Sequence, residues 1–148
     1  MAKIQEFDVV IVGAGAAGLS AGLVMARAAI SVALVDAGEP RNAPAEGMHG
    51  FISRDGIPPG DFLTIATAEV VRYGATTVTD SVHAIERAAN GRFIVTLSSG
   101  PTLSARAVLI ATGLRDELPE IPGVQDRWGS LVHHCPYCHG WEVRDRAI

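Results

Sequence analysis

The stretch FDVVIVGAGAAGLSAGLVMARAAISVALVDAG, residues 7–38, decides the fold. Residues 7–12 form a short β-branched run, which predicts a buried strand. The glycine-rich turn GAGAAG follows at residues 13–18, and the Ala- and Leu-rich residues 19–29 predict a helix. A second apolar run, residues 31–36, ends in an aspartate. Strand, turn, helix and strand in about 30 residues make a βαβ unit, which is typical of a parallel sheet.

The GxGxxG turn predicts a dinucleotide site, because an acidic residue ends the second strand. Gly13 permits the tight turn, Gly15 lets backbone N–H groups approach a pyrophosphate, and Gly18 lets helix and strand pack closely. Asp36 lies 18 residues after Gly18, near the spacing of about 20 expected for an acid on a ribose hydroxyl. A βαβ turn without a ligand, with Asp36 on the surface, is the alternative interpretation.

Downstream, a long Gly- and Pro-rich loop, AGEPRNAPAEGMHGFISRDGIPPG at residues 37–60, precedes a second predicted helix. Loops of this length in compact domains are usually functional. Asp61 is expected to cap a helix that runs to about Tyr73, with Gly74 as its stop.

The next segment reads as β-structure punctuated by two turns. Asn90-Gly91 between apolar runs predicts a hairpin with a type I′ turn, and Ser99-Gly100 marks a second turn. Residues 76–104 therefore predict a strand that feeds a small antiparallel meander. Residues 108–111 are apolar without alternation, which predicts a parallel strand covered on both faces.

Composition narrows the class of protein. The chain has 148 residues, 48 % of them hydrophobic, and a net charge of −4, which argues against a nucleic-acid surface. Residues 9–26 carry no charge, but their four glycines would make a poor membrane helix or signal peptide. Two cysteines spaced CxxC, with no export signal, favour redox or metal chemistry in a reducing compartment, expected to be the cytoplasm.

The ten residues HHCPYCHGWE, 133–142, allow three interpretations by themselves. Cys135 to His139 form a CxxCH pattern, which is typical of c-type haem attachment. With His133 and His134, the two cysteines could also supply part of a zinc site. The third interpretation is a dithiol that opens and closes as a disulfide.

Three motifs in order resemble a known family. The ARAVLIATG segment, residues 105–113, together with GAGAAG resembles the pyridine-nucleotide–disulfide oxidoreductases. The CPYCHGWE segment narrows the resemblance to low-molecular-weight thioredoxin reductases, especially a thioredoxin-reductase-like group with GEPRNAP, HGF and RDG after the second strand. The fold class implied is α/β: a Rossmann-like FAD-binding domain with a parallel sheet and a small antiparallel β-meander, incomplete at the C-terminus.

The resemblance also implies cofactor-binding residues. The glycine turn maps to the FAD pyrophosphate, Asp36 to the adenosine ribose, and the ATG segment to a part that closes over FAD. Four residues of the 37–60 loop, Arg41, Asn42, His49 and Gly50, map near the cofactor less closely. For each of them, a surface position without a role in binding is an equally good interpretation. The full expected set is Gly13, Gly15, Ala16, Ala17, Gly18, Asp36, Arg41, Asn42, His49, Gly50, Ala111, Thr112 and Gly113.

For the cysteine motif, the resemblance implies a redox pair in which Cys138 faces the flavin and Cys135 meets the substrate. Pro136 is expected to restrict the loop so that the sulfurs stay near bonding distance. His139 stands where thioredoxin reductases usually carry a proton-shuttling acid, and an imidazole can do that work near neutral pH. This departure puts thioredoxin in doubt as substrate, since relatives with a CPYCH-type motif include oxidases of small dithiols. A structural turn residue is the other interpretation of His139.

The whole enzyme implied by the resemblance uses NAD(P)H to reduce FAD, and FAD to reduce Cys135–Cys138. The dithiol would then reduce a disulfide substrate, a thioredoxin-like protein or a small molecule, in a homodimer. We expect residues 1–116 to be a FAD-binding part, and residues 117–148 a linker and the start of an NAD(P)H-binding domain.

No second GxGxxG is present, so the chain is expected to be the front half of an enzyme. Without a later strand, residues 108–111 would leave an open apolar edge, and the chain alone would bind FAD weakly and self-associate. A non-enzymatic nucleotide-binding module that pairs through this edge is the alternative.

Overall fold

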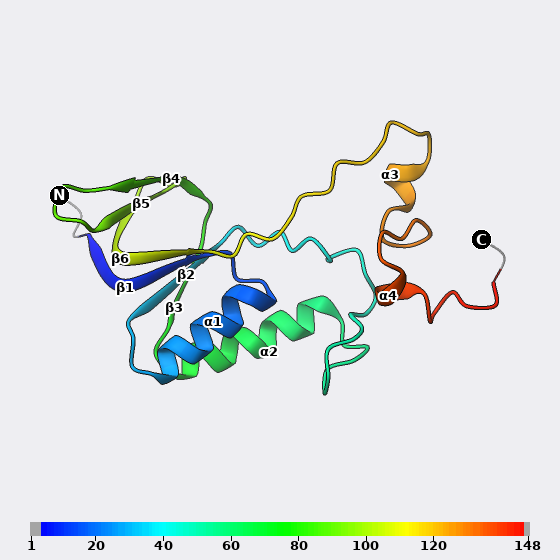
Figure 1. Ribbon diagram of the computed structural model, residues 1–148, viewed down its shortest axis with the longest axis horizontal. Coiled ribbons are helices and arrows are strands. Elements are labelled where there is room, and N and C mark those ends of the chain that lie inside the picture. The colour runs from blue at the N-terminus through cyan, green and yellow to red at the C-terminus, as the bar shows by residue number, and fades with distance from the viewer. Residues whose placement is uncertain (1–3, 147–148) are drawn as a thin grey trace. The chain divides into compact units, whose positions relative to one another are not determined.

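The structure, a computed structural model that describes residues 4–146, is built on one six-stranded sheet in the order β3-β2-β1-β6-β5-β4 (Figure 1). Its strands are β1 (Gln5–Val12), β2 (Val32–Asp36), β3 (Thr76–Thr79), β4 (Val82–Arg87), β5 (Phe93–Leu97) and β6 (Thr102–Ile110). Its helices are α1 (Ala16–Arg27), α2 (Pro59–Arg72), α3 (Val124–Arg127) and α4 (Pro136–His139).

The chain divides into two compact units, each described by itself. The first unit comprises Met1–Glu39 and Leu63–Gly113, and the second comprises Pro40–Phe62 and Leu114–Ile148. The predicted boundary between a FAD-binding part, residues 1–116, and a second part, residues 117–148, stays a prediction. Within residues 4–146 no helix has the length and apolar character that a membrane span requires.

The first unit confirms the predicted βαβ unit and the α/β fold class. Strand β1 pairs in parallel with β2 on one side and with β6 on the other, and β2 pairs in parallel with β3. Strands β4, β5 and β6 form the antiparallel meander. Three parallel pairings place the carboxyl ends of β1, β2 and β3 at one edge of the sheet, where open α/β sheets bind ligands.

Two apolar clusters cover the two faces of this sheet. Ile11 and Leu34 are buried on the face that packs against α1 and α2, which lie together on one side of the sheet (Figure 1). Val10 and Val35 are buried on the other face, with residues of the meander such as Leu103. Successive side chains of a strand point to opposite faces, so the run from Val9 to Val12 is apolar throughout because both faces are covered.

Strand β6 joins the meander to the parallel sheet in one continuous element. Its first half, Thr102–Ala105, pairs with β5, and residues 103–110 pair with β1. Strand β6 is an interior strand in the sheet order, in which β3 and β4 are the edges, but its pairing with β5 ends at Ala105. Within the described part of the chain, residues 108–110 therefore do show the unpaired edge that was predicted for residues 108–111. Only from Arg106 onward does the side facing β5 have no pairing among the described residues, and Ile110 is 59 % exposed there.

The hairpin between β4 and β5 is confirmed, but its predicted turn type is wrong. A type I′ turn needs positive φ at both central residues. Gly91 has a φ of +81°, whereas Asn90 is not among the residues with positive φ. The amide of Gly91 donates to the carbonyl of Ala88, and that of Ala88 donates to the carbonyl of Arg92. The hairpin therefore has a longer loop in which both of these hydrogen bonds are made. Of Asn90 and Gly91, only Gly91 has a left-handed backbone conformation.

Helix α2 begins three residues earlier than predicted. Pro59 starts the helix, and Asp61 lies within its first turn rather than capping it. Proline is favoured at the first helical position because it has no N–H to leave unpaired, and a carboxylate in the first turn interacts well with the helix dipole. Gly74 ends the segment as expected, with a φ of +89°.

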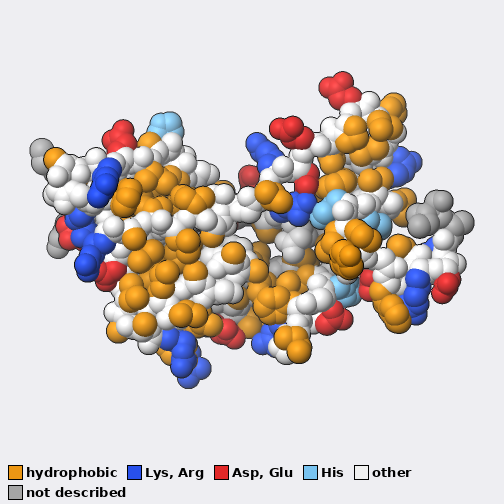
Figure 2. All heavy atoms as spheres, viewed as in Figure 1, with side chains coloured by type: hydrophobic (Ala, Val, Ile, Leu, Met, Phe, Trp, Pro, Cys, Tyr) orange, Lys and Arg blue, Asp and Glu red, His pale blue; other side chains and the backbone are white. Residues whose placement is uncertain are grey.

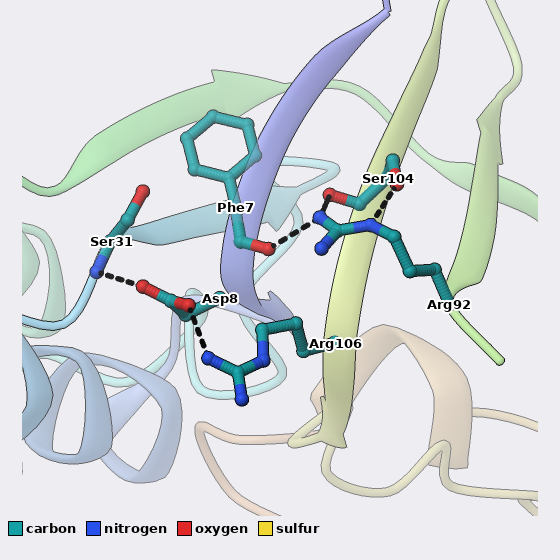
Figure 3. A network of polar contacts seen from close by, with 6 residues as sticks. All are labelled: Phe7, Asp8, Ser31, Arg92, Ser104 and Arg106. Atoms are coloured by element: carbon teal, nitrogen blue, oxygen red, sulfur yellow. Dashed lines mark hydrogen bonds and ion pairs between the residues drawn. The ribbon is translucent and has the colours of Figure 1, made fainter. Parts of the chain in front are cut away.

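A polar network ties β5, β6 and β1 together (Figure 3). The guanidinium of Arg92 donates to Ser104 Oγ at 2.7 Å and to the carbonyl of Phe7 at 3.0 Å. Asp8 accepts from the amide of Ser31 at 3.1 Å and pairs with Arg106 at 3.3 Å. Ser104 is the only buried polar side chain among the described residues, and Arg92 satisfies it.

Candidate functional site

The glycine turn between β1 and α1 is shaped by close backbone approaches. Gly13 has a φ of +101°, and a Cβ placed there would run into the carbonyl of Ala111. A Cβ on Gly18 would strike the carbonyl of Gly13. In contrast, Gly15 has nothing within 4 Å of the place where its Cβ would be, and it stands at the N-terminus of α1 with no side-chain cap. Gly13 and Gly18 are therefore required by the fold. Gly15 instead leaves space for a ligand at the N-terminus of α1.

Asp36, at the end of β2, faces this turn. Its Oδ2 accepts from the amide of Ala14 at 2.5 Å, and its Oδ1 accepts from the amide of Gly38 at 2.7 Å. An ionised carboxylate has about four acceptor positions, so two remain for hydroxyl groups. The same residue can therefore hold the turn in place and bind a ribose.

A cavity of about 290 Å³ opens beside the turn, within the first unit. It brings together three of the expected cofactor residues with a segment that the sequence did not single out. The lining residues are Val12, Gly13, Val35, Asp36, Ala37, Glu39, Asp80, Ser81, Val82 and Thr112. This volume is near the lower end for ligand pockets, so it suits one part of a dinucleotide rather than the whole molecule.

The segment after β3 was missed by sequence reasoning. Asp80 donates its amide to the carbonyl of Asp36 at 2.9 Å, which brings Ser81 and Val82 to the edge where β1 and β2 end. The hydroxyl of Ser99, the amide of Ser81 and the amide of Ser99 donate to the carboxylate, and the first of these contributes most to holding the pKa of Asp80 below its usual value. The sequence analysis interpreted residues 76–104 as a strand that leads into the meander. It did not predict that β3 pairs in parallel with β2, which is what brings this segment to the site.

The cavity is acidic. Asp36, Glu39 and Asp80 all line it, and no Lys or Arg does. Carboxylates accept hydrogen bonds from hydroxyl and amino groups and repel phosphate. The cavity therefore suits the nucleoside end of a ligand, and a phosphate would lie instead at the open N-terminus of α1, beside Gly15.

The other expected cofactor residues lie in varied places. Ala16 and Ala17 are exposed in the first turn of α1, and Ala111 donates its amide to the carbonyl of Val12 at 2.8 Å. Thr112 and Gly113 follow β6 and are exposed.

Four expected residues belong to the second unit, where they have partners of their own. Arg41 donates from Nε and from a terminal nitrogen to the two carboxylate oxygens of Asp116, at 2.7 and 2.6 Å. This hydrogen-bonded pairing lowers the pKa of Asp116. The carbonyl of Asn42 accepts from Ala45, and the amide of Gly50 donates to the carboxylate of Asp55. A cofactor role for these four, which include His49, stays a prediction.

The cysteine motif lies at the short helix α4 in the second unit. Cys135 and Cys138 are joined by a disulfide, with their Cα atoms 5.3 Å apart. Cys135 is the N-cap residue, Pro136 begins the helix, and the amide of Cys138 donates to Cys135 Sγ at 3.2 Å. Both cysteines are half-buried. An N–H group directed at one sulfur would stabilise a thiolate there after reduction.

His133 and His134 precede this helix and His139 ends it, and Figure 2 shows histidine side chains, in pale blue, close together. The rings of His133 and His139 stack with centroids 4.5 Å apart, and the ring of His134 stacks on Trp128 at 5.2 Å. The Nδ1 atoms of His133 and His139 are buried without a hydrogen-bond partner among the described residues. Burial, followed by the charge of His133, lowers the pKa of His139, and Glu142 opposes that shift. The lowered pKa favours the neutral form of the His139 imidazole.

His49, in the loop before α2, contacts Glu142, which follows α4 in the chain. Its Nε2 lies 3.5 Å from Glu142 Oε1, and its Nδ1 lies 3.6 Å from Asp55 Oδ1. Sequence reasoning named His49 for the cofactor and gave Asp55 and Glu142 no role. Both acids were present in the quoted RDG and CHGWE segments, but nothing in local spacing predicts that these segments meet.

Among residues 4–146, no group of three or more histidine, cysteine or carboxylate side chains is arranged to hold a metal ion.

Comparison with known proteins defines the class. The sequence model of the pyridine nucleotide-disulphide oxidoreductases matches residues 7–147, and the chain belongs to this family. Within it, the chain is thioredoxin-reductase-like: it is 38 % identical over 141 residues to thioredoxin reductase aclD of Aspergillus oryzae, covering 93 % of this chain and 45 % of that protein.

Solved structures agree on the fold. HlmI is 55 % identical with a TM-score of 0.91, covering 95 % of this chain and 45 % of that one. An oxidoreductase from Agrobacterium tumefaciens is 44 % identical with a TM-score of 0.89, covering 95 % and 48 %. The chain spans between 37 % and 50 % of the length of five curated relatives that it matches.

Proposed function

We propose that the chain is the flavin- and disulfide-bearing part of a FAD-dependent oxidoreductase that exchanges electrons with a disulfide or dithiol substrate. One observation carries the proposal: a CxxC disulfide whose first sulfur receives a backbone N–H, in a chain of this family. The acidic cavity and the open glycine turn support a bound dinucleotide.

The residues of the first unit fit FAD. The acceptors of Asp36, with the cavity beside them, would hold the ribose and the base, and Gly15 with the N-terminus of α1 would receive the pyrophosphate. When bound, a flavin would supply an acceptor and donor of two electrons for a disulfide.

The two cysteines have different roles. Cys135 receives the amide of Cys138, so its thiolate is the stabilised one and attacks the substrate disulfide. That attack forms a mixed disulfide and releases one substrate thiol. Cys138 then attacks Cys135 Sγ, which releases the second substrate thiol and restores the disulfide. The family resemblance assigns Cys138 to the flavin side.

Protons must follow the electrons. Converting the disulfide to two thiols takes two electrons and two protons, and the reverse reaction releases them. His139, whose pKa is lowered by burial, is neutral at physiological pH and can accept a proton from a thiol. In the whole protein NAD(P)H would be the electron donor, and the assembly would be a homodimer.

An oxidase of small dithiols is the second candidate, and the neighbours of the cysteines favour it. Tyr137, between the cysteines, is 95 % exposed, and Trp141 is 71 % exposed. Exposed aromatic rings beside the disulfide can stack on a small apolar substrate. In this direction the dithiol substrate would be oxidised, and molecular oxygen would be the final electron acceptor.

Trapping of the mixed disulfide tests the proposal. The reduced Cys138→Ser variant is expected to accumulate an adduct on Cys135 with a disulfide probe, whereas reduced Cys135→Ser forms it at least tenfold more slowly. Mass spectrometry detects the adduct. Oxidised thioredoxin and cystamine, used separately, distinguish a protein substrate from a small molecule. Equal rates for the two variants with both probes would contradict the assigned roles.

A further inference from the structure

A second cavity in the first unit, of about 370 Å³, is not used by the proposed redox chemistry. Its walls include Val78 of β3, Leu97 of β5 and Leu103 of β6. Leu97 and Leu103 are buried in the apolar cluster on the meander side of the sheet, and Val78 packs against that cluster. A volume of this size falls within the range of ligand pockets, about 300–1,000 Å³. The cavity can therefore take a small molecule with an apolar body.

The same cavity contains one carboxylate, that of Asp80. Its Oδ2 accepts from the hydroxyl and the amide of Ser99, and its Oδ1 accepts from the amide of Ser81 at 2.7 Å. The hydroxyl of Ser99 contributes most to lowering the pKa of Asp80, so the carboxylate is ionised at neutral pH. An ionised carboxylate has about four acceptor positions, and these three bonds leave one for a ligand.

This lining selects a ligand by charge as well as by shape. Within residues 4–146, the residues that line the cavity include no lysine, arginine or histidine, so an anion would be repelled. An ammonium group would make a charge-assisted hydrogen bond to the carboxylate, which a neutral molecule cannot match. Asp80 is half-buried and Ser99 is exposed, so the charged end of the ligand would stay partly hydrated and its desolvation would cost little.

From this geometry we infer that the second cavity binds a small organic monocation, with a primary ammonium group on the carboxylate of Asp80 and an apolar body against Leu97 and Leu103. The inference does not depend on the redox role of the cysteines, which lie in the second unit.

Asp80 also lines the acidic cavity beside the glycine turn, and its amide donates to the carbonyl of Asp36 at 2.9 Å. A cation could therefore bind in either cavity, and the two positions must be told apart. Leu97 and Leu103 line only the second cavity, whereas Asp36 and Glu39 line only the acidic one. A ligand with an apolar body favours the second cavity, because that cavity is the larger and reaches the buried apolar cluster.

Two probes of the same shape test the role of charge: phenethylamine, which is a cation at neutral pH, and phenethyl alcohol, which is neutral. NMR spectra of the backbone amides of the 148-residue chain, recorded without FAD during a titration with each probe, report both affinity and position. The amine is expected to bind with a Kd of about 1 mM, the order for a ligand of its size. It should bind about fivefold more tightly than the alcohol, as a partly screened ion pair allows. The largest shifts are expected at the amides of Ser99 and Leu103.

A pair of matched variants separates the charge of Asp80 from its place in the fold. Asp80→Asn keeps the size of the side chain and removes its charge, so the affinity for the amine should fall about fivefold, to that for the alcohol. Unchanged binding of the alcohol would show that the cavity persists in this variant. Glu69→Gln removes an exposed carboxylate from α2 in the same unit and should leave the affinities for both probes unchanged.

The unchanged protein alone can overturn the inference, whatever the stability of Asp80→Asn. Equal affinities for the two probes, or no binding of the amine, would refute a cation site. Shifts centred on the amides of Ala14 and Gly38, which donate to Asp36, would place the amine in the acidic cavity and refute the assigned position.

Discussion

Gly15 and Gly18 offer a matched pair of substitutions that separates folding from binding. An added methyl group at Gly18 meets the carbonyl of Gly13 and the side chain of Ile11, whereas at Gly15 it meets nothing within 4 Å. Overpacking costs about 3 kcal/mol at the upper end of its usual range, and alanine regains about 1 kcal/mol over glycine inside a helix. Gly18→Ala should therefore lose about 2 kcal/mol.

At Gly15, replacing an N-cap glycine by alanine costs only about 0.5 kcal/mol. Each kcal/mol lowers the unfolding temperature of a chain this size by about 3 °C, so the expected losses are about 6 °C for Gly18→Ala and about 2 °C for Gly15→Ala. Circular dichroism during thermal unfolding measures both. FAD binding should show the opposite order from stability, with Gly15→Ala the more damaging substitution. The new methyl group at Gly15 lies where the pyrophosphate would approach.

FAD affinity, measured by quenching of flavin fluorescence, is expected to fall at least tenfold in Gly15→Ala, since one charge-assisted contact contributes about 1.5–3 kcal/mol. The reasoning fails if Gly15→Ala binds FAD like the unchanged protein, or if it unfolds as early as Gly18→Ala.

Three further perturbations test other parts of the structure. Arg92→Leu should lower the free energy of unfolding in urea by about 1–3 kcal/mol, because Ser104 is left buried without its partner. A loss below about 0.5 kcal/mol would contradict the importance of that hydrogen bond. Asp116→Asn should change the free energy of unfolding much less than Arg92→Leu in the same assay, since its pair with Arg41 is partly exposed. The pKa of His139 is lowered in the folded chain, so as the pH falls the unfolded chain binds a proton at this residue first. The contribution of His139 to the free energy of unfolding is therefore fully present above pH 6.5 and declines below it. His139→Gln should flatten this decline, and an unchanged pH profile would count against it.

The first unit was the more predictable part, because its signals are local. The apolar runs of β1 and β2, the glycine turn and Asp36 lie within 32 consecutive residues and suffice for the βαβ unit (residues 7–38). The run at residues 108–111 predicted a parallel strand and was right in type, but its continuity with the meander depends on pairing partners that lie far away in the chain.

The second unit was less predictable, since its important contacts join distant segments. Arg41 meets Asp116 across 75 residues, and His49 meets Glu142 across a longer separation. Such contacts depend on how a loop folds back, which hydrophobic periodicity does not report. The CxxC motif predicted two cysteines within bonding distance, which the structure confirms, but the stacking of His133 on His139 could not be derived from their positions in the sequence.

The most direct test of the account is the visible absorption spectrum of the purified protein with FAD, recorded before and after one equivalent of dithiothreitol without oxygen. We predict that the blue absorption band of the bound flavin is lost in the unchanged protein and retained in Cys138→Ser, because electrons reach the flavin through that sulfur. A band lost equally fast in both proteins, or no bound flavin at all, would contradict the claim that Cys135–Cys138 is the redox partner of a flavin.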